Sequence, residues 1–105
     1  MSTQAERTTV LDEEVTLAPQ WHVVLLDDND HSYDYVIHLL GAVFGYGPEK
    51  SFALARIVDT EGRVIVFTGT QEKALEYQEK IHTFGADPLI PRCKGSMSAI
   101  VEPAA

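Results

Sequence analysis

The chain has 105 residues, of which 45% are hydrophobic, and its 8 Lys and Arg stand against 16 Asp and Glu, for a formal net charge of −8. This length supplies one hydrophobic core, so we expect a single domain. The acidic balance argues against nucleic acid as a partner, because binding of phosphates needs a basic face. It favours cationic ligands or a basic protein surface, although most surface acids only keep a protein soluble.

Cysteine and histidine usage sets the expected compartment and cofactors. Cys93 is the only cysteine, so the chain can form neither an internal disulfide nor a cysteine zinc site, and a reducing cytoplasm fits best. The four histidines include no close HxH or HxxxH pair, so we expect no metal and no cofactor. No segment has the apolar block of a signal peptide or the ~20 apolar residues of a membrane span. We therefore expect a cytoplasmic protein with no membrane partner.

Residues 1–20 carry Thr, Glu, Asp and isolated apolar residues with neither helical nor strand periodicity. We expect a flexible tail here, followed by a core domain at 21–102. Two interpretations of this tail are equally good: it docks transiently through its apolar residues, or it is a disordered leader without a role. The apolar residues available for docking are Val10, Leu11, Val15 and Leu17.

The first expected elements are a strand and a helix separated by acids. Trp21–Leu26 is a run of mostly β-branched or large apolar residues, which is typical of a buried strand. The acids and amide of Asp27–Asp30 prefer turns and caps, so they should lie at a strand-to-helix corner. The helix should begin near Ser32, a good N-cap, and end at Gly45–Gly47. Its expected inward stripe is Tyr33, Val36, Ile37, Leu40 and Phe44.

A second helix and a second strand follow. Pro48 suits the first turn of a helix that should run to about Val58. Asp59–Gly62 predicts a turn. Arg63–Thr68 is largely apolar, which favours a strand at a central position in the sheet. The inward residues of the helix should be Phe52, Ala55 and Val58.

Gln71–Phe84 is the clearest amphipathic helix, and Gly85 is well placed to cap it. Leu89–Cys93, interrupted by Pro91, predicts a short third strand at an edge or a bulge. Lys94–Glu102 could add a further extended piece. The inward stripe of the helix should be Ala74, Tyr77, Gln78 and Ile81.

The expected order is strand, helix, helix, strand, helix, strand. The helices should pack on one face of a small three-stranded sheet, which makes the fold class α+β, a two-layer β-α-α-β-α-β domain. The order of the strands within the sheet is not readable from this pattern.

The acidic corner suggests recognition rather than catalysis. Its spacing does not fit an EF-hand loop, which needs alternating ligands, a glycine and a terminal glutamate. A hydrolase with paired carboxylates would need an apolar pocket that raises one pKa, and the adjacent His31 and Ser32 do not by themselves make a catalytic pair. A carboxylate rim beside an apolar floor suits a cation attached to a hydrophobic side chain, such as the amino terminus of a peptide with a bulky first residue. Capping of the helix by the acids is the alternative, and both can hold at once.

Five segments between Trp21 and about Ile90 carry a family resemblance by their order and spacing: Leu25–Asn29, Tyr33–Ile37, Val58–Arg63, Val66–Thr68 and Pro88–Leu89. In these segments the sequence resembles the ClpS adaptors. This resemblance implies an α+β fold with three strands and three helices. It also implies a non-enzymatic adaptor that selects substrates for an AAA+ unfoldase of the ClpA or ClpC type by holding destabilising N-terminal residues such as Phe, Leu, Trp or Tyr.

Carried over residue by residue, the resemblance implies two groups of site residues. Several positions depart from the family pattern: Asp27-Asp28-Asn29 stands for the usual Asn-Asp-Asp, Asp59 for a histidine, His31 for a threonine, and Tyr33 and Ala55 for methionines. The ligand ammonium should be held by Asp27, Asp28, Asn29 and Asp59. The first side chain should lie in a hydrophobic pocket made by His31, Tyr33, Val36, Ala55, Val58 and Leu89.

An alternative function belongs to a different class. The chain could be a ClpS-fold interaction module that has lost N-terminal recognition and binds or regulates another protein through a helix face. The family's docking residues for the unfoldase, a Glu and a Lys, fall near Thr70 and near Leu75 or Tyr77 in this chain. A panel of peptides that differ only in residue one separates the two hypotheses.

Overall fold

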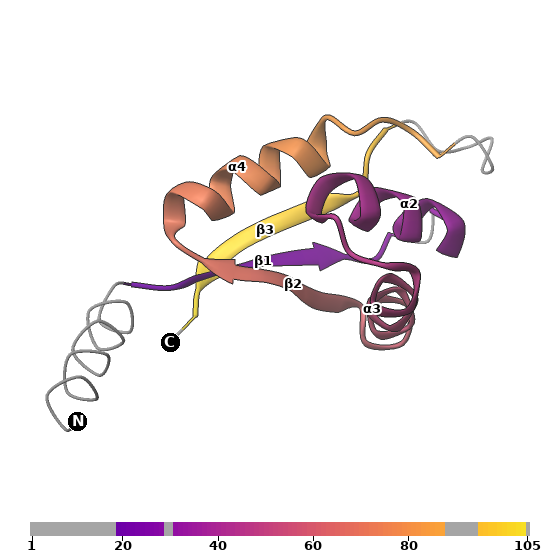
Figure 1. Ribbon diagram of the computed structural model, residues 1–105, viewed down its shortest axis with the longest axis horizontal. Helices are drawn as coiled ribbons and strands as arrows, with labels where there is room; N and C mark the ends of the chain where they lie inside the picture. Colours follow the sequence, from indigo (N-terminus) through magenta and orange to yellow (C-terminus); the bar gives the residue numbers. More distant parts are fainter. Residues whose placement is uncertain (1–18, 29–30, 88–94, 105) are drawn as a thin grey trace, which may run out of the picture.

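A small antiparallel sheet and three helices make up the computed structural model, which describes residues 19–28, 31–87 and 95–104 (Figure 1). The expected α+β class and the order of the elements are confirmed. The elements are β1 (Trp21–Leu26), α2 (Tyr33–Phe44), α3 (Pro48–Glu61), β2 (Arg63–Gly69), α4 (Gln71–His82) and β3 (Ser98–Pro103).

The sheet has the strand order β2-β1-β3, so β1 is central and β2 is an edge strand. The central position that we predicted for Arg63–Thr68 is therefore wrong. The apolar side chains of this strand alternate between the two faces of the sheet: Val64 and Val66 are buried, whereas Ile65 is 46% exposed. This pattern is expected of a strand in an antiparallel sheet with only one covered face. The register shifts opposite Val23 and Val24, and the hydroxyl of Tyr46 donates to the Val66 carbonyl at this irregularity, at 2.7 Å.

The third strand lies closer to the C-terminus than the segment we predicted for it. β3 pairs with β1 from Ser98 to Pro103, within and just beyond the Lys94–Glu102 segment that we expected to add a further extended piece. The strand predicted at Leu89–Cys93 lies outside the described residues. The backbone N–H of Ala104 also donates to the carbonyl of Gln20 at 2.9 Å, so hydrogen bonding begins one residue before β1.

Helix α2 begins and ends where the sequence predicts. The Ser32 hydroxyl accepts a hydrogen bond from the backbone N–H of Tyr35, and Gly45 ends the helix in the left-handed region with φ 77°. The inward stripe is only partly as predicted, because Tyr35 and Leu39 are buried and were not assigned to it. The buried residues of α2 are Tyr35, Val36, Leu39 and Leu40.

Helix α3 is longer than predicted. It continues through the expected turn to Glu61, and Gly62 ends it with φ 84°. Phe52, predicted to face inward, is 46% exposed, since the neighbouring Ser51 occupies the buried position. The buried residues of α3 are Ser51, Ala55 and Val58.

Helix α4 begins at Gln71 after the N-cap Thr70, and its amphipathic pattern is confirmed. Ala74 and Ile81 are fully buried, and the other two residues of the predicted stripe are partly buried. The helix ends two residues earlier than predicted, with Thr83 rather than Gly85 as its C-cap.

The helices cover one face of the sheet, and the opposite face is exposed. Ile65 and Ile100 are the exposed partners of Val24 on the open face. Arg63 and Glu102 form an ion pair from β2 to β3, and the strand register places this pair across β1 at Val24, which is fully buried. The covered face contributes Val23, Leu25, Val64, Val66 and Ala99 to the core.

Candidate functional site

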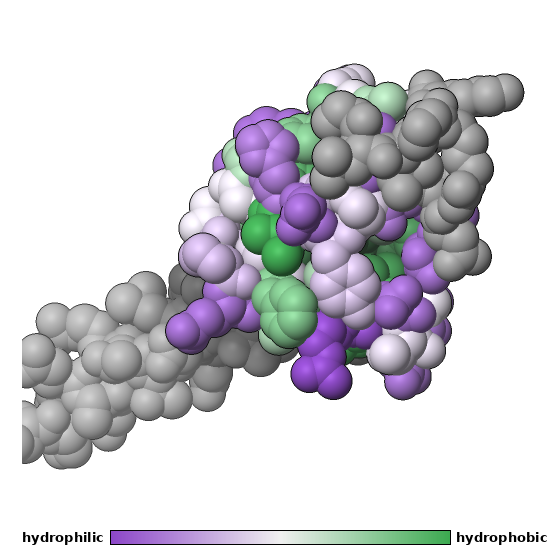
Figure 2. Space-filling model, turned by 90° about the vertical axis from the view of Figure 1, so that its right-hand side faces the viewer, coloured by the Kyte–Doolittle hydropathy of each residue, from purple (hydrophilic) through white to green (hydrophobic). Residues whose placement is uncertain are grey.

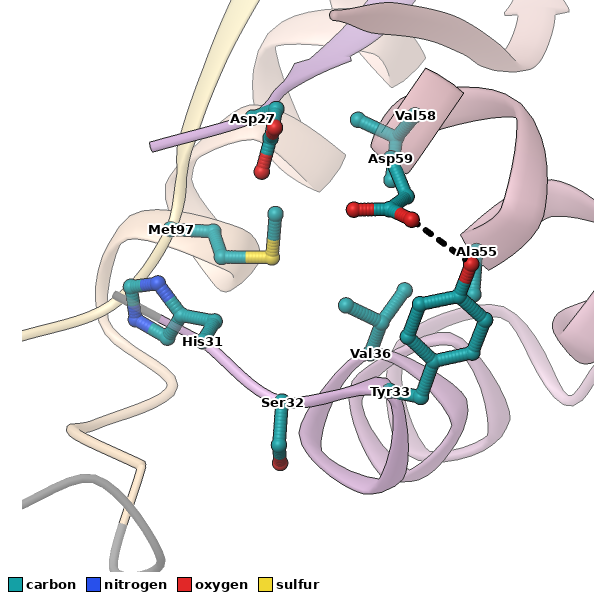
Figure 3. A pocket seen from close by; sticks show the side chains of 9 residues that line it. All are labelled: Asp27, His31, Ser32, Tyr33, Val36, Ala55, Val58, Asp59 and Met97. Carbon is teal, nitrogen blue, oxygen red and sulfur yellow. Dashed lines mark hydrogen bonds between the residues drawn. The ribbon is translucent and has the colours of Figure 1, made fainter. Parts of the chain in front are cut away.

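A narrow pocket lies where the start of α2, the second half of α3, the end of β1 and the approach to β3 meet (Figure 3). Its free space is about 20 Å³, which is enough for about one water molecule. The pocket combines an apolar interior with polar groups at its edge. Its lining residues are Asp27, His31, Ser32, Tyr33, Val36, Ala55, Val58, Asp59 and Met97.

Backbone hydrogen bonds bring the end of β1 to the end of α3. The N–H of Asp27 donates to the carbonyl of Gly62 at 3.0 Å, and the N–H of Gly62 donates to the carbonyl of Val58. The left-handed conformation of Gly62, which glycine adopts without strain, permits this contact. As a result, two carboxylates from distant parts of the sequence, Asp27 and Asp59, line the same pocket.

The interior of the pocket is apolar and closely packed. Val36 comes from α2, Ala55 and Val58 come from α3, and Met97 precedes β3; all four are at most 4% exposed. Met97 is the adaptable member of this set, because its side chain is unbranched and can change rotamer to fill or vacate a gap.

The two helices are joined across the edge of the pocket by Tyr33 and Asp59. The Tyr33 hydroxyl donates to Oδ2 of Asp59 at 2.9 Å. This hydrogen bond raises the pKa of Tyr33 above its ordinary value of 10.0, with smaller contributions in the same direction from burial and from the charge of Asp59. Figure 3 shows the other carboxylate oxygen of Asp59 directed away from Tyr33, toward the side of the pocket where Asp27 and Met97 lie. Tyr33 thus leaves one oxygen of Asp59 available to a ligand.

His31 connects the acidic corner to the segment before β3. Its Nδ1 lies 2.8 Å from Oδ1 of Asp28, and its Nε2 lies 2.8 Å from the carbonyl oxygen of Gly95. The ring therefore lies between a side-chain oxygen of the acidic corner and a backbone oxygen of the segment before β3. The ring also contacts Tyr35, with 4.5 Å between the ring centroids. These contacts hold the segment that carries Met97 beside the pocket.

The start of α2 is held by a buried carboxylate. Asp87 is 2% exposed, and its Oδ2 accepts a hydrogen bond from the backbone N–H of Ser32 at 2.6 Å. A carboxylate at a helix N-terminus is also favoured by the helix dipole. Asp87 therefore fixes the backbone from which Tyr33 projects.

The structure brings most of the predicted site residues together. Two of the four predicted ammonium ligands, Asp27 and Asp59, line the pocket, whereas Asp28 contacts His31 instead of lining it. Asn29 and Leu89 lie outside the described residues. The predicted pocket residues that do line it are His31, Tyr33, Val36, Ala55 and Val58.

Met97 and Ser32 line the pocket but were not predicted as site residues. The sequence carries no clear period-two signal for Met97, because Ile100 interrupts the alternation of apolar and polar residues. In the structure Met97 and Ala99 are buried while Ser98 and Ile100 are exposed, as the alternation of side chains along an extended chain requires.

In residues 19–28, 31–87 and 95–104, no three His, Cys, Asp or Glu side chains come together in a group that could hold a metal ion. None of the helices described there has the length and apolar character needed to cross a membrane.

Comparison with known proteins identifies the family. Residues 16–89 match the family model described as ATP-dependent Clp protease adaptor protein ClpS. The ATP-dependent Clp protease adapter protein ClpS of Rhodococcus jostii is 31% identical over 83 residues, which cover 79% of this chain and 73% of the relative. The protein of the same name from Nautilia profundicola is 33% identical over 72 residues, which cover 69% of this chain and 74% of the relative.

A solved structure with the same fold is that of Agrobacterium tumefaciens ClpS2 bound to L-phenylalaninamide. It has a TM-score of 0.69 at 18% sequence identity, and the match covers 81% of this chain and 96% of that one. The chain therefore belongs to the ClpS family of ATP-dependent Clp protease adaptor proteins, as the sequence resemblance predicted.

Proposed function

We propose that this adaptor selects protein substrates by their N-terminal residue, without catalysis, and delivers them in the cytoplasm to an AAA+ unfoldase of the ClpA or ClpC type. The observation that carries the proposal is the Asp59 carboxylate, which Tyr33 holds at the edge of an apolar pocket. Agrobacterium tumefaciens ClpS2, which has the same fold, binds L-phenylalaninamide, an amine with a bulky apolar side chain.

In this proposal the ligand's ammonium lies between the carboxylates of Asp27 and Asp59. An ammonium has three N–H donors, and ionised carboxylates only accept, so the pairing is complementary in charge and in hydrogen bonding. Asp28 and Asn29 remain predicted contributors to this part of the site.

The first side chain of the ligand enters the apolar interior. A space of about 20 Å³ is smaller than any bulky side chain, so entry requires a neighbouring side chain to move. Met97 is suited to this, because a methionine exchanges rotamers at low cost. Once Met97 has moved, the ligand's side chain would be surrounded by Val36, Ala55 and Val58. Leu89 is a further predicted residue of this wall.

A binding panel tests the proposal. Labelled peptides that differ only in residue one, each with a free or an acetylated amino terminus, are titrated with the protein. We expect tighter binding of bulky apolar first residues and loss of binding on acetylation, because acetylation removes the ammonium charge. Equal binding of all peptides, free and acetylated, would contradict the proposal.

Asp59→Asn supplies the residue-specific test, since the amide keeps the shape but removes the charge. We expect binding to weaken about tenfold or more, the loss typical of one hydrogen bond between charged groups. Asp34→Asn is the matched control, because Asp34 is an exposed acid in the first turn of α2 that does not line the pocket. Equal effects of the two substitutions would show that only overall charge matters.

The narrowness of the pocket favours one other candidate function, an interaction module that no longer binds N-terminal residues. It predicts no preference for residue one in the same panel, together with retained binding to the unfoldase.

A further inference from the structure

The outward face of α3 carries a second feature next to the pocket. A shallow, open hollow of about 280 Å³ is lined by Ala53, Arg56, Ile57 and Thr60, whose spacing of three and four residues places them on one side of the helix. Phe52, adjacent in sequence, is 46% exposed and Ile57 is 42% exposed. On the face of the molecule at the α2 and α3 end, apolar patches lie among hydrophilic ones (Figure 2).

Arg56 differs from the other cations of the described ranges. These contain five Lys and Arg residues, and four of them have an ion-pair or aromatic partner: Lys50 lies over Tyr46, Arg63 pairs with Glu102, Lys73 pairs with Glu76, and Lys80 lies over Tyr77. Within these ranges Arg56 has neither an ion pair nor an aromatic contact of this kind. In a chain with a net charge of −8, a cation without such a partner, set between exposed apolar side chains, indicates a ligand with complementary charge.

This surface is continuous with the pocket. The ring of Tyr33 packs against Phe52, with 5.8 Å between the centroids. Arg56 is close enough to Tyr33 to oppose part of the increase in its pKa. Asp59 lies one turn along the helix from Arg56. The helix rises about 1.5 Å per residue, so Phe52 and Asp59, which are seven positions apart, are separated by about 10 Å along the axis, the length of about three extended residues.

We propose that the surface formed by Phe52, Arg56 and Ile57 binds the second and third residues of the substrate and prefers an acidic side chain there. This inference rests on the proposed function, because the pocket must fix the first residue before the chain can follow α3. The charge of Arg56 attracts a carboxylate, while Phe52 and Ile57 offer apolar contact to the rest of the segment. Thr60 offers the ligand an acceptor and not a donor, since its hydroxyl already donates to the carbonyl of Arg56 at 2.8 Å.

The test compares peptides that share a first Phe and carry Ala, Glu or Lys at positions two and three. Binding of each is measured for the parent, for Arg56→Gln and for Lys73→Gln, and melting temperatures confirm that the variants are folded. Lys73→Gln is the matched control, since it removes one positive charge from an exposed position on α4. We expect the Glu peptide to bind the parent about threefold more tightly than it binds Arg56→Gln. A factor of this size corresponds to one exposed ion pair.

The control separates a local effect of Arg56 from a change in net charge. The ratio of Glu to Ala peptide affinity should fall in Arg56→Gln and remain unchanged in Lys73→Gln. Equal ratios in the parent and both variants would overturn the inference while leaving first-residue recognition in place. If no peptide with a free amino terminus binds the parent, the proposed function fails and this inference fails with it. Arg56→Gln could instead lose binding to the unfoldase while its ratio of Glu to Ala peptide affinity stays unchanged. That result would show that the surface binds the unfoldase, and it would overturn the inference.

Discussion

Helices α2 and α3 both supply walls to the pocket, but they are built differently. Helix α2 buries Tyr35, Val36, Leu39 and Leu40. Helix α3 buries one residue fewer, and two of its three, Ser51 and Ala55, are small, while Phe52 and Ile57 are exposed. Small inward residues reduce the apolar surface that α3 buries, so α3 contributes less to the core than α2 does. The comparison predicts that α2 mainly stabilises the fold, while α3, under the proposed function, mainly presents side chains to ligands. Three predictions test this division, beginning with the largest effect.

Truncation in α2 should have the largest effect on stability. Leu39 is fully buried, and Leu39→Ala should reduce the free energy of unfolding by about 2–5 kcal/mol, through lost apolar burial and the cavity left behind. Urea unfolding monitored by circular dichroism measures this. Leu75→Ala is the control, because Leu75 is 48% exposed and its truncation should change stability by no more than about 0.5 kcal/mol. Similar losses in both variants would contradict the assignment of α2 to the core.

Enlarging a small wall residue of α3 should have an intermediate effect on stability and a clear effect on binding. Ala55 is 1% exposed in the pocket wall, so Ala55→Leu should cost about 1–3 kcal/mol of unfolding free energy through overpacking. It should also abolish the preference for bulky first residues, because the new side chain fills the pocket.

The neighbouring Ala53 supplies the control for this change. Ala53 is exposed on the other side of α3, so Ala53→Leu should leave the free energy of unfolding within about 0.5 kcal/mol of the parent. Unchanged stability and unchanged first-residue preference in Ala55→Leu would mean that the pocket does not have the wall described.

The same contrast explains which parts of the fold could be predicted. The bounds of α2 follow from local chemistry, since Ser32 and Gly45 are a strong N-cap and a left-handed C-cap. The inward face of α3 does not, because Phe52 and Ser51 are neighbours and hydrophobicity alone favours burial of Phe52. Tertiary packing decides otherwise, as it does for β2, whose apolar run did not reveal an edge position.

The site residues were predicted from the family resemblance. The contacts between site residues that are distant in sequence could not be predicted. Asp27 and Asp59 could be assigned to one site by their matching positions in the family pattern. The hydrogen bond of Tyr33 to Asp59 could not, because it joins residues 26 apart in sequence and depends on how α2 packs on α3. Met97 lines the pocket from the residue just before β3, within the Lys94–Glu102 segment for which we expected an extended piece but assigned no inward residues.

The smallest predicted effect concerns the hydrogen bond that joins the two helices. Asp59 raises the pKa of Tyr33 by accepting this bond, burial and the charges of Asp59 and Asp27 add to the increase, and Arg56 opposes it. A folded-state pKa above the unfolded value means that folding favours the protonated phenol. The stabilisation is therefore complete below pH 10.0 and is lost as the pH rises through the folded-state pKa of Tyr33.

Two variants isolate this titration. Tyr33→Phe should remove one late-titrating phenol from the ultraviolet absorbance titration. The free energies of unfolding of Tyr33→Phe and of the parent should converge as the pH rises above 10.0. Asp59→Asn should shift the titration of Tyr33 toward that ordinary value, because the charge on the acceptor is lost. Tyr46, whose pKa burial also raises, with a smaller contribution from Tyr77, is the internal reference and should titrate alike in all three proteins. If Tyr33 titrates identically in the parent and in Asp59→Asn, then the contact between α2 and α3 is not the cause of its raised pKa, and the two helices are not joined through this pair in solution.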